Sequence, residues 1–467
     1  MKINKITATL IGLGLVSFAG AALADSTVTI SGNQYTEVFI TGSTAARGTV
    51  FHAVDTAHSS GGVFDSVPTF ILPGGPGTPT TSTGAYTAYG TIGGTRYCLC
   101  FSWTGSEAGL WAIQHNSGGI PNPILANTLN GNPAYPNAVI PGTPAPTSFV
   151  DPNTYASFSA NADLSMADTS QAVSLSPSPA LHDFGIVGAV TFEWVKGNES
   201  SPDQAWNDLV NVTDPQLNYL LGSPQSASFF TGVDADSSDL VFAVGRNKAS
   251  GTHQNTMIDT QHGTTTLVDQ YVVNNSGYSS SGQLTNGVVE SVSTAGGISE
   301  VFNDGFDSGG GVAAELSCDT HGSQNVYSGG SIEVNTPIIL LGYAGISDAN
   351  TAITASGSDA KALTLNGVPE NDATVIHGAY SFWGHEHLYG EVNPDSSVIA
   401  VGQALAGTTV ITGFGSGTPN GALEAAGQEG GGEAVSAQAT TQSTIISPQY
   451  MQADKPEGSD SGYPSQI

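Results

Sequence analysis

Short apolar runs alternate with loops of small polar residues at four places in the chain. The runs are residues 37–40, 97–103, 163–166 and 240–244, and each is followed by a loop rich in Ser, Thr, Ala or Gly. Apolar runs of this length, bounded by turn-forming residues, are typical of buried strands. Three of the loops lead into helix-like sequence, so the pattern predicts an α/β protein with mainly parallel sheets.

Between these units lie stretches rich in Gly, Pro, Ser and Thr. Residues 72–94 and 118–152 are the longest of them, and a Gly-, Ser- and Gln-rich tail follows from Gly413. Such composition favours turns over regular elements. We expect the two internal stretches to be surface insertions and the tail to be loosely ordered.

The N-terminal segment has the form of a signal peptide. Lys2 and Lys5 precede an apolar run over residues 6–21, and Ala22-Leu23-Ala24 has the small-x-small pattern of a cleavage site. No Cys follows Ala24, so a lipid anchor is not expected there. We expect residues 1–24 to be removed and the mature chain to be a periplasmic protein with no membrane insertion.

Charge narrows the range of partners. The 467 residues include 9 Lys and Arg against 39 Asp and Glu, for a formal charge of −30. Long-range repulsion disfavours nucleic acid and anionic lipid as partners, but it does not exclude a small anion held by local donors. After loss of Lys2 and Lys5, three of the remaining cations, Arg47, Arg246 and Lys248, lie in or beside the polar loops.

Those loops have the chemistry of an anion site. Backbone N–H groups and hydroxyls at the start of a helix, together with the helix dipole, attract negative charge. A single loop of this kind is explained as well by N-capping. Four such loops, with Arg47 and Arg246 beside them, favour an anion site, because Arg forms paired hydrogen bonds with oxyanions.

The loops resemble those of the periplasmic phosphate-binding proteins of ABC importers. Residues 245–252, Gly-Arg-Asn-Lys-Ala-Ser-Gly-Thr, are similar to the family's R-x-D-G-S-G-T loop, and residues 42–45, 105–109 and 165–168 resemble its other ligand loops. The resemblance implies a two-lobed type II binding-protein fold with a hinge and no enzymatic activity or cofactor. It assigns phosphate binding to Ser43, Thr44, Ala45, Ser106, Asp168, Arg246, Ser250, Gly251 and Thr252.

Asp168 carries the argument on selectivity. By resemblance it is the buried Asp that accepts a proton from the ligand. An ionised carboxylate only accepts hydrogen bonds, so it favours an anion that keeps an O–H, as phosphate does and sulfate at neutral pH does not. Facing sulfate would leave the carboxylate unpaired and repelled, at a cost of several kcal/mol.

Three positions depart from the family pattern or lack an explanation. Lys248 stands where the family usually has an Asp, which makes the surroundings of Arg246 more positive. Ala45 stands where a bulky residue is common, so that wall of the pocket is expected to be open. Glu107, next to Ser106, would repel an anion, and we expect it to be a solvated residue of the first helical turn.

The resemblance also implies a domain organisation. Lobe 1 would comprise residues 25–190 and 377–467, and lobe 2 residues 191–376. Ligand would bind in the crevice at the carboxyl ends of the strands. We expect a monomer that delivers phosphate to an ABC transporter permease.

Two other classes of protein remain as alternatives. His377, His385 and His387 could offer imidazoles to zinc or copper and so make the protein a metal carrier. An acidic, β-rich surface protein would explain the composition but not the ordered loops. The three cysteines, Cys98, Cys100 and Cys318, permit one disulfide and one free thiol, without indicating the pair.

Overall fold

A computed structural model gives the structure of the chain. It describes residues 26–80, 83–114, 148–169, 181–199, 201–246, 250–264, 266, 268, 289–290, 306, 308–317, 323–328, 331–408, 414, 421–423, 445–455 and 465–466. The predicted signal segment, residues 118–147 of the second predicted insertion, Lys248, Cys318 and most of the residues after Gly413 therefore lie outside the described part.

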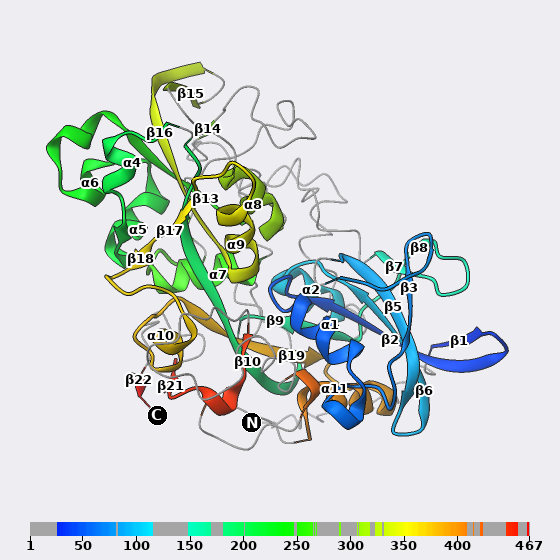
Figure 1. The fold of residues 1–467 in the computed structure, drawn as a ribbon. Coiled ribbons are helices and arrows are strands. Elements are labelled where there is room, and N and C mark those ends of the chain that lie inside the picture. Colours follow the sequence, from blue (N-terminus) through cyan, green and yellow to red (C-terminus); the bar gives the residue numbers. More distant parts are fainter. Residues whose placement is uncertain are drawn as a thin grey trace, which may run out of the picture.

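The protein is a mixed α/β structure built on one large sheet, with helices packed along it (Figure 1). The strand order along the main path of this sheet is β12-β13-β16-β10-β19-β9-β2-β6-β5-β3-β4. The strands are β1 (Thr27–Ile30), β2 (Asn33–Gly42), β3 (Thr69–Leu72), β4 (Gly75–Pro76), β5 (Ala85–Ile92), β6 (Thr95–Ser102), β7 (Ser148–Val150), β8 (Ser157–Ser159), β9 (Leu164–Ala167), β10 (His182–Lys196), β11 (Asn211–Val212), β12 (Gln225–Ser226), β13 (Leu240–Val244), β14 (Val289–Glu290), β15 (Ser323–Ser328), β16 (Ser331–Gly345), β17 (Lys361–Ala362), β18 (Thr364–Leu365), β19 (Trp383–Gly390), β20 (Ile445–Ile446), β21 (Ala453–Asp454) and β22 (Ser465–Gln466). The helices are α1 (Arg47–Asp55), α2 (Ser106–Gln114), α4 (Gln204–Asp208), α5 (Asp214–Gly222), α6 (Ser228–Thr231), α7 (Gly251–Asp259), α8 (Gly309–Leu316), α9 (Ile346–Thr354), α10 (Asp372–Ile376) and α11 (Ser396–Ala406).

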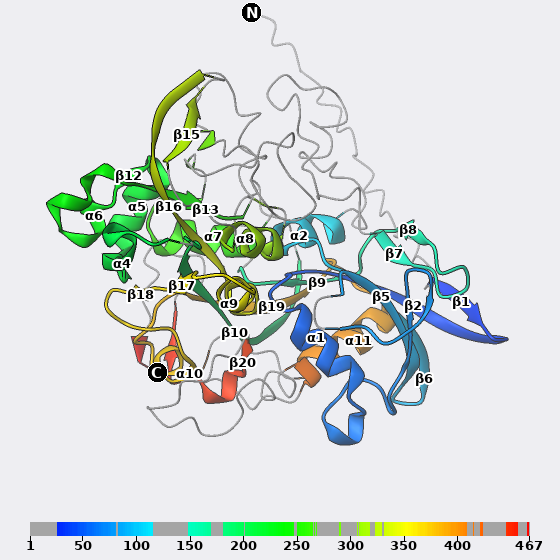
Figure 2. The ribbon, with the colours of Figure 1, turned by 45° about the horizontal axis from the view of Figure 1, so that its top comes forward.

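Strand β10 joins the two halves of the sheet. Its first part, up to Thr191, pairs with β19, and its last part, from Phe192, pairs with β16. The blue and cyan elements β1–β6, α1 and α2 gather on one side of β10, and the green and yellow elements α4–α9, β13 and β16 gather on the other (Figures 1 and 2). The same strand thus belongs to two lobes.

The expectation of mainly parallel sheets is wrong. Strands β2 and β6, β2 and β9, and β13 and β16 are parallel, but β10 runs antiparallel to both β16 and β19. Residues 72–94 are also not a mere surface insertion, because β5 forms an antiparallel hairpin with β6 and buries Tyr86 and Ala88 completely. A hairpin needs only a short turn, so these strands pair without the helix that a parallel crossover requires.

Three of the four predicted strand–loop–helix units are confirmed. Strand β2 leads into α1, β6 into α2 and β13 into α7. For β9 the strand is confirmed, but the residues that follow it, 170–180, lie outside the described part. Within the described ranges, no helix combines the length and the apolar character needed to cross a bilayer.

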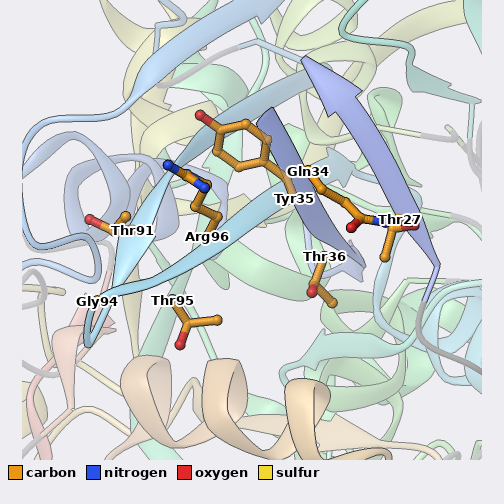
Figure 3. Close-up of a pocket in the computed structure, with 8 residues that line it drawn as sticks. All are labelled: Thr27, Gln34, Tyr35, Thr36, Thr91, Gly94, Thr95 and Arg96. Carbon is orange, nitrogen blue, oxygen red and sulfur yellow. Dashed lines mark hydrogen bonds between the residues drawn. The ribbon is translucent and has the colours of Figure 1, made fainter. Parts of the chain in front are cut away.

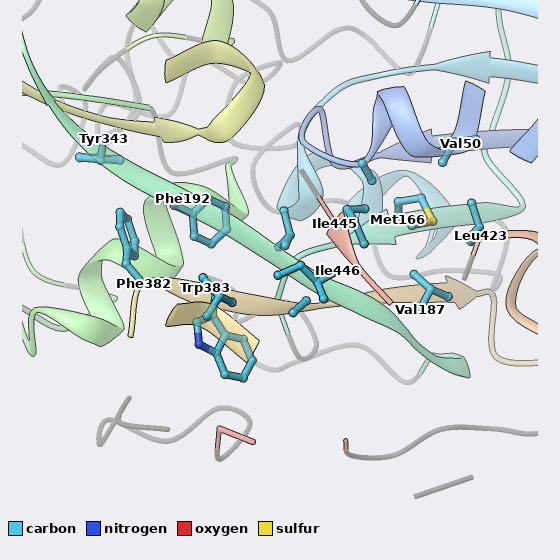
Figure 4. Close-up of a cluster of buried hydrophobic side chains, with 14 of the residues drawn as sticks. Val50, Met166, Val187, Phe192, Tyr343, Phe382, Trp383, Leu423, Ile445 and Ile446 are labelled. Carbon is cyan, nitrogen blue, oxygen red and sulfur yellow. The ribbon is translucent and has the colours of Figure 1, made fainter. Parts of the chain in front are cut away.

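Aromatic side chains fill the core along β10 where the two lobes meet (Figure 4). Trp194 packs edge-on against Tyr343 with ring centroids 5.2 Å apart, and Phe192 lies 5.2 Å from Phe382. All four rings are at most 1% exposed. Each buried ring contributes ~1.5–3 kcal/mol of hydrophobic free energy, so the junction between the lobes is a packed core.

Candidate functional site

Three of the polar loops meet at one edge of the sheet. Strands β9, β2 and β6 are parallel neighbours, so their carboxyl ends bring residues 42–47, 103–106 and 168–169 together. The backbone N–H groups of Thr104 and Gly105 donate to the carbonyl of Gly42 at 3.2 and 2.9 Å. Gly42 has φ 114°, and a Cβ there would overlap the backbone of Met166. Only glycine therefore fits at the end of β2, where its backbone lies against β9.

Ser106 and Asp168 are joined at the centre of this edge. The Ser106 hydroxyl, at the start of α2, donates a short hydrogen bond to Asp168 Oδ1. Both residues are buried, at 1% and 2% exposure. Among the described residues, this hydrogen-bonded pair is the buried polar group that the first lobe contributes to the candidate site.

The second lobe contributes a buried arginine. Arg246 follows β13 and is 2% exposed. Its Nε donates to the carbonyl of Phe306 at 3.2 Å, and its Nη1 donates to Thr44 Oγ1 at 3.2 Å. Because Thr44 belongs to the first lobe, this hydrogen bond spans the gap between the lobes.

Helix α7 begins against Asp168. Ser250 caps the helix by accepting a hydrogen bond from the backbone N–H of His253 at 3.4 Å. Gly251 approaches so closely that a Cβ on it would overlap Asp168 Oδ1. Asn255 donates to the carbonyl of Asp168 at 2.6 Å. The loops that the sequence assigned to two lobes therefore meet around one carboxyl group.

The electrostatics of Asp168 follow from this packing. Burial raises its pKa to about 6, and the Ser106 hydroxyl, the Arg246 guanidinium and the Thr252 hydroxyl act in the opposite direction. At neutral pH the group is therefore mostly ionised, in a buried site that also holds a guanidinium. Of the assigned residues, Ser106, Asp168, Arg246, Gly251 and Thr252 lie together, Thr44 contacts them through Arg246, and Ser250 holds the start of α7.

Ser43 and Ala45 lie at the edge of this group. Ser43 is 1% exposed, and its Oγ accepts from the backbone N–H of Ala46 at 3.3 Å, which places it in the turn before α1. Ala45 is half-buried and faces Gly345 of the other lobe. The wall expected to be open at Ala45 is thus approached by the end of β16.

The expectation for Glu107 is wrong. Its side chain is 1% exposed and accepts a hydrogen bond from the Thr169 hydroxyl at 2.9 Å. The carboxylate sits in the first turn of α2, as the helix dipole favours, but the loop after β9 covers it. The sequence predicted the position of Glu107 in the first helical turn, but it did not predict that the loop after β9 covers the side chain.

A second buried carboxyl group escaped the sequence analysis. Glu386 of β19 is fully buried, and neither carboxyl oxygen has a hydrogen bond of ordinary geometry within the described part of the chain. Burial raises the pKa of Glu386 well above its usual range, and the charge of Asp168 adds to this effect, while the Ser43 hydroxyl opposes it. A second buried carboxyl group, with a raised pKa, therefore lies near Asp168. The signal was its position between His385 and His387, which places it on the opposite face of the strand.

The three histidines do not assemble into a metal site. His385 Nε2 contacts Asp454 at 2.8 Å, His387 Nδ1 lies 3.4 Å from Asp183, and His377 caps the end of α10. In the ranges that the structure describes, no group of three or more His, Cys, Asp or Glu side chains could hold a metal ion. Cys98 and Cys100 are two residues apart in β6 and so lie on one face of it, and both are buried free thiols.

A polar pocket of about 430 Å³ lies elsewhere, where the β1–β2 and β5–β6 hairpins adjoin (Figure 3). It is lined by Tyr35, Arg96 and several Thr residues, and Arg96 is exposed. The pocket contains an arginine and hydroxyl groups, as the group around Asp168 does, but it lies on the surface of one lobe.

Comparisons with known proteins give structural likeness only. No family model and no curated protein matches the chain. A phosphate ABC transporter substrate-binding protein from Clostridium perfringens, solved with bound phosphate, is 11% identical, with a TM-score of 0.34 over 79% of this chain and 92% of that one. PstS from Borrelia burgdorferi is 12% identical, with a TM-score of 0.31 over 78% and 90% of the two chains. An ABC-type phosphate transport receptor from Vibrio cholerae is 12% identical, with a TM-score of 0.34 over 78% and 93%. Scores and identities this low give no information on the function of this chain.

Proposed function

We propose that the protein binds inorganic phosphate in the cleft between its two lobes. The observation that carries the proposal is the burial of Asp168 and Arg246 in one site, with the Ser106 and Thr252 hydroxyls beside them. A cation with hydroxyl and backbone donors attracts an oxyanion, and an acceptor-only carboxylate demands that the oxyanion keep a proton. Phosphate at neutral pH meets both requirements.

The role in the cell follows from the resemblance of the loops and from the N-terminal segment. Residues 1–24 would direct the chain to the periplasm, and residues 25–190 with 377–467 would form one lobe and residues 191–376 the other. The protein would act as a monomeric, non-enzymatic receptor that passes phosphate to an ABC importer. Closure of the lobes about β10 and β19 would bury the ligand.

Calorimetry on the mature protein tests this proposal. The sample is first unfolded, dialysed and refolded, so that carried-over ligand is removed. We expect 1:1 binding of phosphate and no measurable heat with sulfate at neutral pH. Equal affinity for the two anions would exclude the role given to Asp168, and absence of phosphate binding would exclude the function.

A further inference from the structure

The starts of helices α1 and α9, which belong to different lobes, lie close together. Figures 1 and 2 both show the two helices side by side, although they belong to different lobes. A Cβ on Gly345, which precedes α9, would lie 3.6 Å from the Cβ of Ala45, which precedes the start of α1. Arg47 and Asp348, the charged residues of these two turns, therefore both lie where the two lobes meet.

Asp348 lies in a restricted space between two arginines. Its carboxylate sits against Gly309 at the start of α8, where a Cβ would overlap Oδ2. Burial raises the pKa of Asp348, and Arg246 and then Arg47 act against this rise. For Arg47, burial lowers the pKa and the charge of Asp348 opposes that shift. One carboxylate thus attracts a guanidinium from each lobe.

Asp348 also faces the arginine of the candidate site. It reaches Arg246 from the first turn of α9. The negative charge that faces Arg246 therefore comes from a residue that also faces the other lobe.

We propose that Arg47 and Asp348 form a charge pair across the cleft that holds the lobes closed over the bound anion. The inference rests on the proposed phosphate function. The hydrogen bond from Arg246 to Thr44, which also joins the two lobes, uses groups assigned to the ligand, so a bound anion competes for it. Neither Arg47 nor Asp348 is assigned to the ligand, although Asp348 also faces Arg246. The pair stabilises the closed form, and its loss should speed ligand release.

A double-mutant cycle tests the pair. Arg47→Gln, Asp348→Asn and the double variant are compared with the mature protein by stopped-flow measurement of phosphate dissociation. We expect each single substitution to raise the dissociation rate about three- to fivefold, the range for a partly exposed ion pair. The double variant should be no faster than the faster single variant, because the second change removes nothing further. The association rate should change much less.

Asp359→Asn supplies the matched control, because Asp359 is an exposed acid of the same lobe. Combined with Arg47→Gln, it should give strictly additive effects. Additivity in the cycle of Arg47 and Asp348 would overturn the proposed pair while leaving phosphate binding intact. If the mature protein fails to bind phosphate at all, the proposed function and this inference fall together. Should Arg47→Gln fail to fold, Arg47→Lys replaces it in the cycle, with a smaller expected coupling.

Discussion

The buried candidate site and the surface pocket contain the same kinds of side chain in different surroundings. In the candidate site, Arg246 is 2% exposed and donates hydrogen bonds to the carbonyl of Phe306 and the hydroxyl of Thr44. In the pocket, Arg96 is exposed, between two hairpins of one lobe (Figure 3). Both places offer a guanidinium and Thr hydroxyls.

The difference lies in burial and in the origin of the groups. A charge–charge interaction is several times stronger in a buried site than in water, and salt screens it less. Groups that come from two lobes can also enclose a ligand, whereas two hairpins of one lobe offer an open surface. Residue types alone therefore do not define an anion site.

The largest expected effect separates the two arginines. Arg246→Ala should weaken phosphate binding by roughly a hundredfold or more, because charge-assisted hydrogen bonds contribute ~1.5–3 kcal/mol each and the truncation leaves buried anionic charge without a partner. Arg96→Ala should leave the affinity unchanged within about twofold. Calorimetric titration of both variants measures the phosphate affinity. Similar small losses for the two variants would show that Arg246 does not bind phosphate.

The next largest effect concerns the preference of the site for phosphate over sulfate. Asp168→Asn replaces an acceptor-only group with one that also donates, so the variant should bind sulfate and lose about tenfold or more of its preference for phosphate. Competition titrations with both anions provide the measurement. A variant that still rejects sulfate would place the source of selectivity elsewhere.

The same group should make selectivity depend on pH. The pKa of Asp168 is raised to about 6, so the carboxyl group is ionised above that pH and progressively protonated below it. Protonation turns an acceptor into a donor, and sulfate binding should therefore appear as pH falls from about 7 to about 5. The Asp168→Asn variant is the control, since its sulfate affinity should not follow this titration. Sulfate affinity that stays absent down to about pH 5 would contradict the assignment.

The smallest expected effect concerns the histidines. Replacing His377, His385 and His387 together by Ala should leave phosphate affinity unchanged in a folded variant, and zinc should not stabilise the unsubstituted protein. Phosphate at ~100 times its dissociation constant should raise the free energy of unfolding by about 2.7 kcal/mol. Thermal melts distinguish the two ligands, and stabilisation by zinc but not by phosphate would favour the metal carrier.

Much of the candidate site could be predicted because its parts are local. Strand, polar loop and helix start are each encoded within about ten residues, as in the segments that become β2 with α1 and β13 with α7. Glu386 had only its position between two histidines of a strand as a signal, and Asp348 had no local signal. Their importance arises from neighbours more than a hundred residues away in the chain, Asp168 for one and Arg47 with Arg246 for the other.

The sequence by itself determined where the polar loops are and which chemical groups they offer, because hydroxyls, glycines and an arginine next to a helix start can be identified from the local sequence alone. The tertiary structure alone decided that β10 joins two lobes, that Glu107 is buried and that Asp348 faces two arginines. Burial and charge pairing depend on which distant segments pack together, and the periodicity of one segment carries no information on that choice.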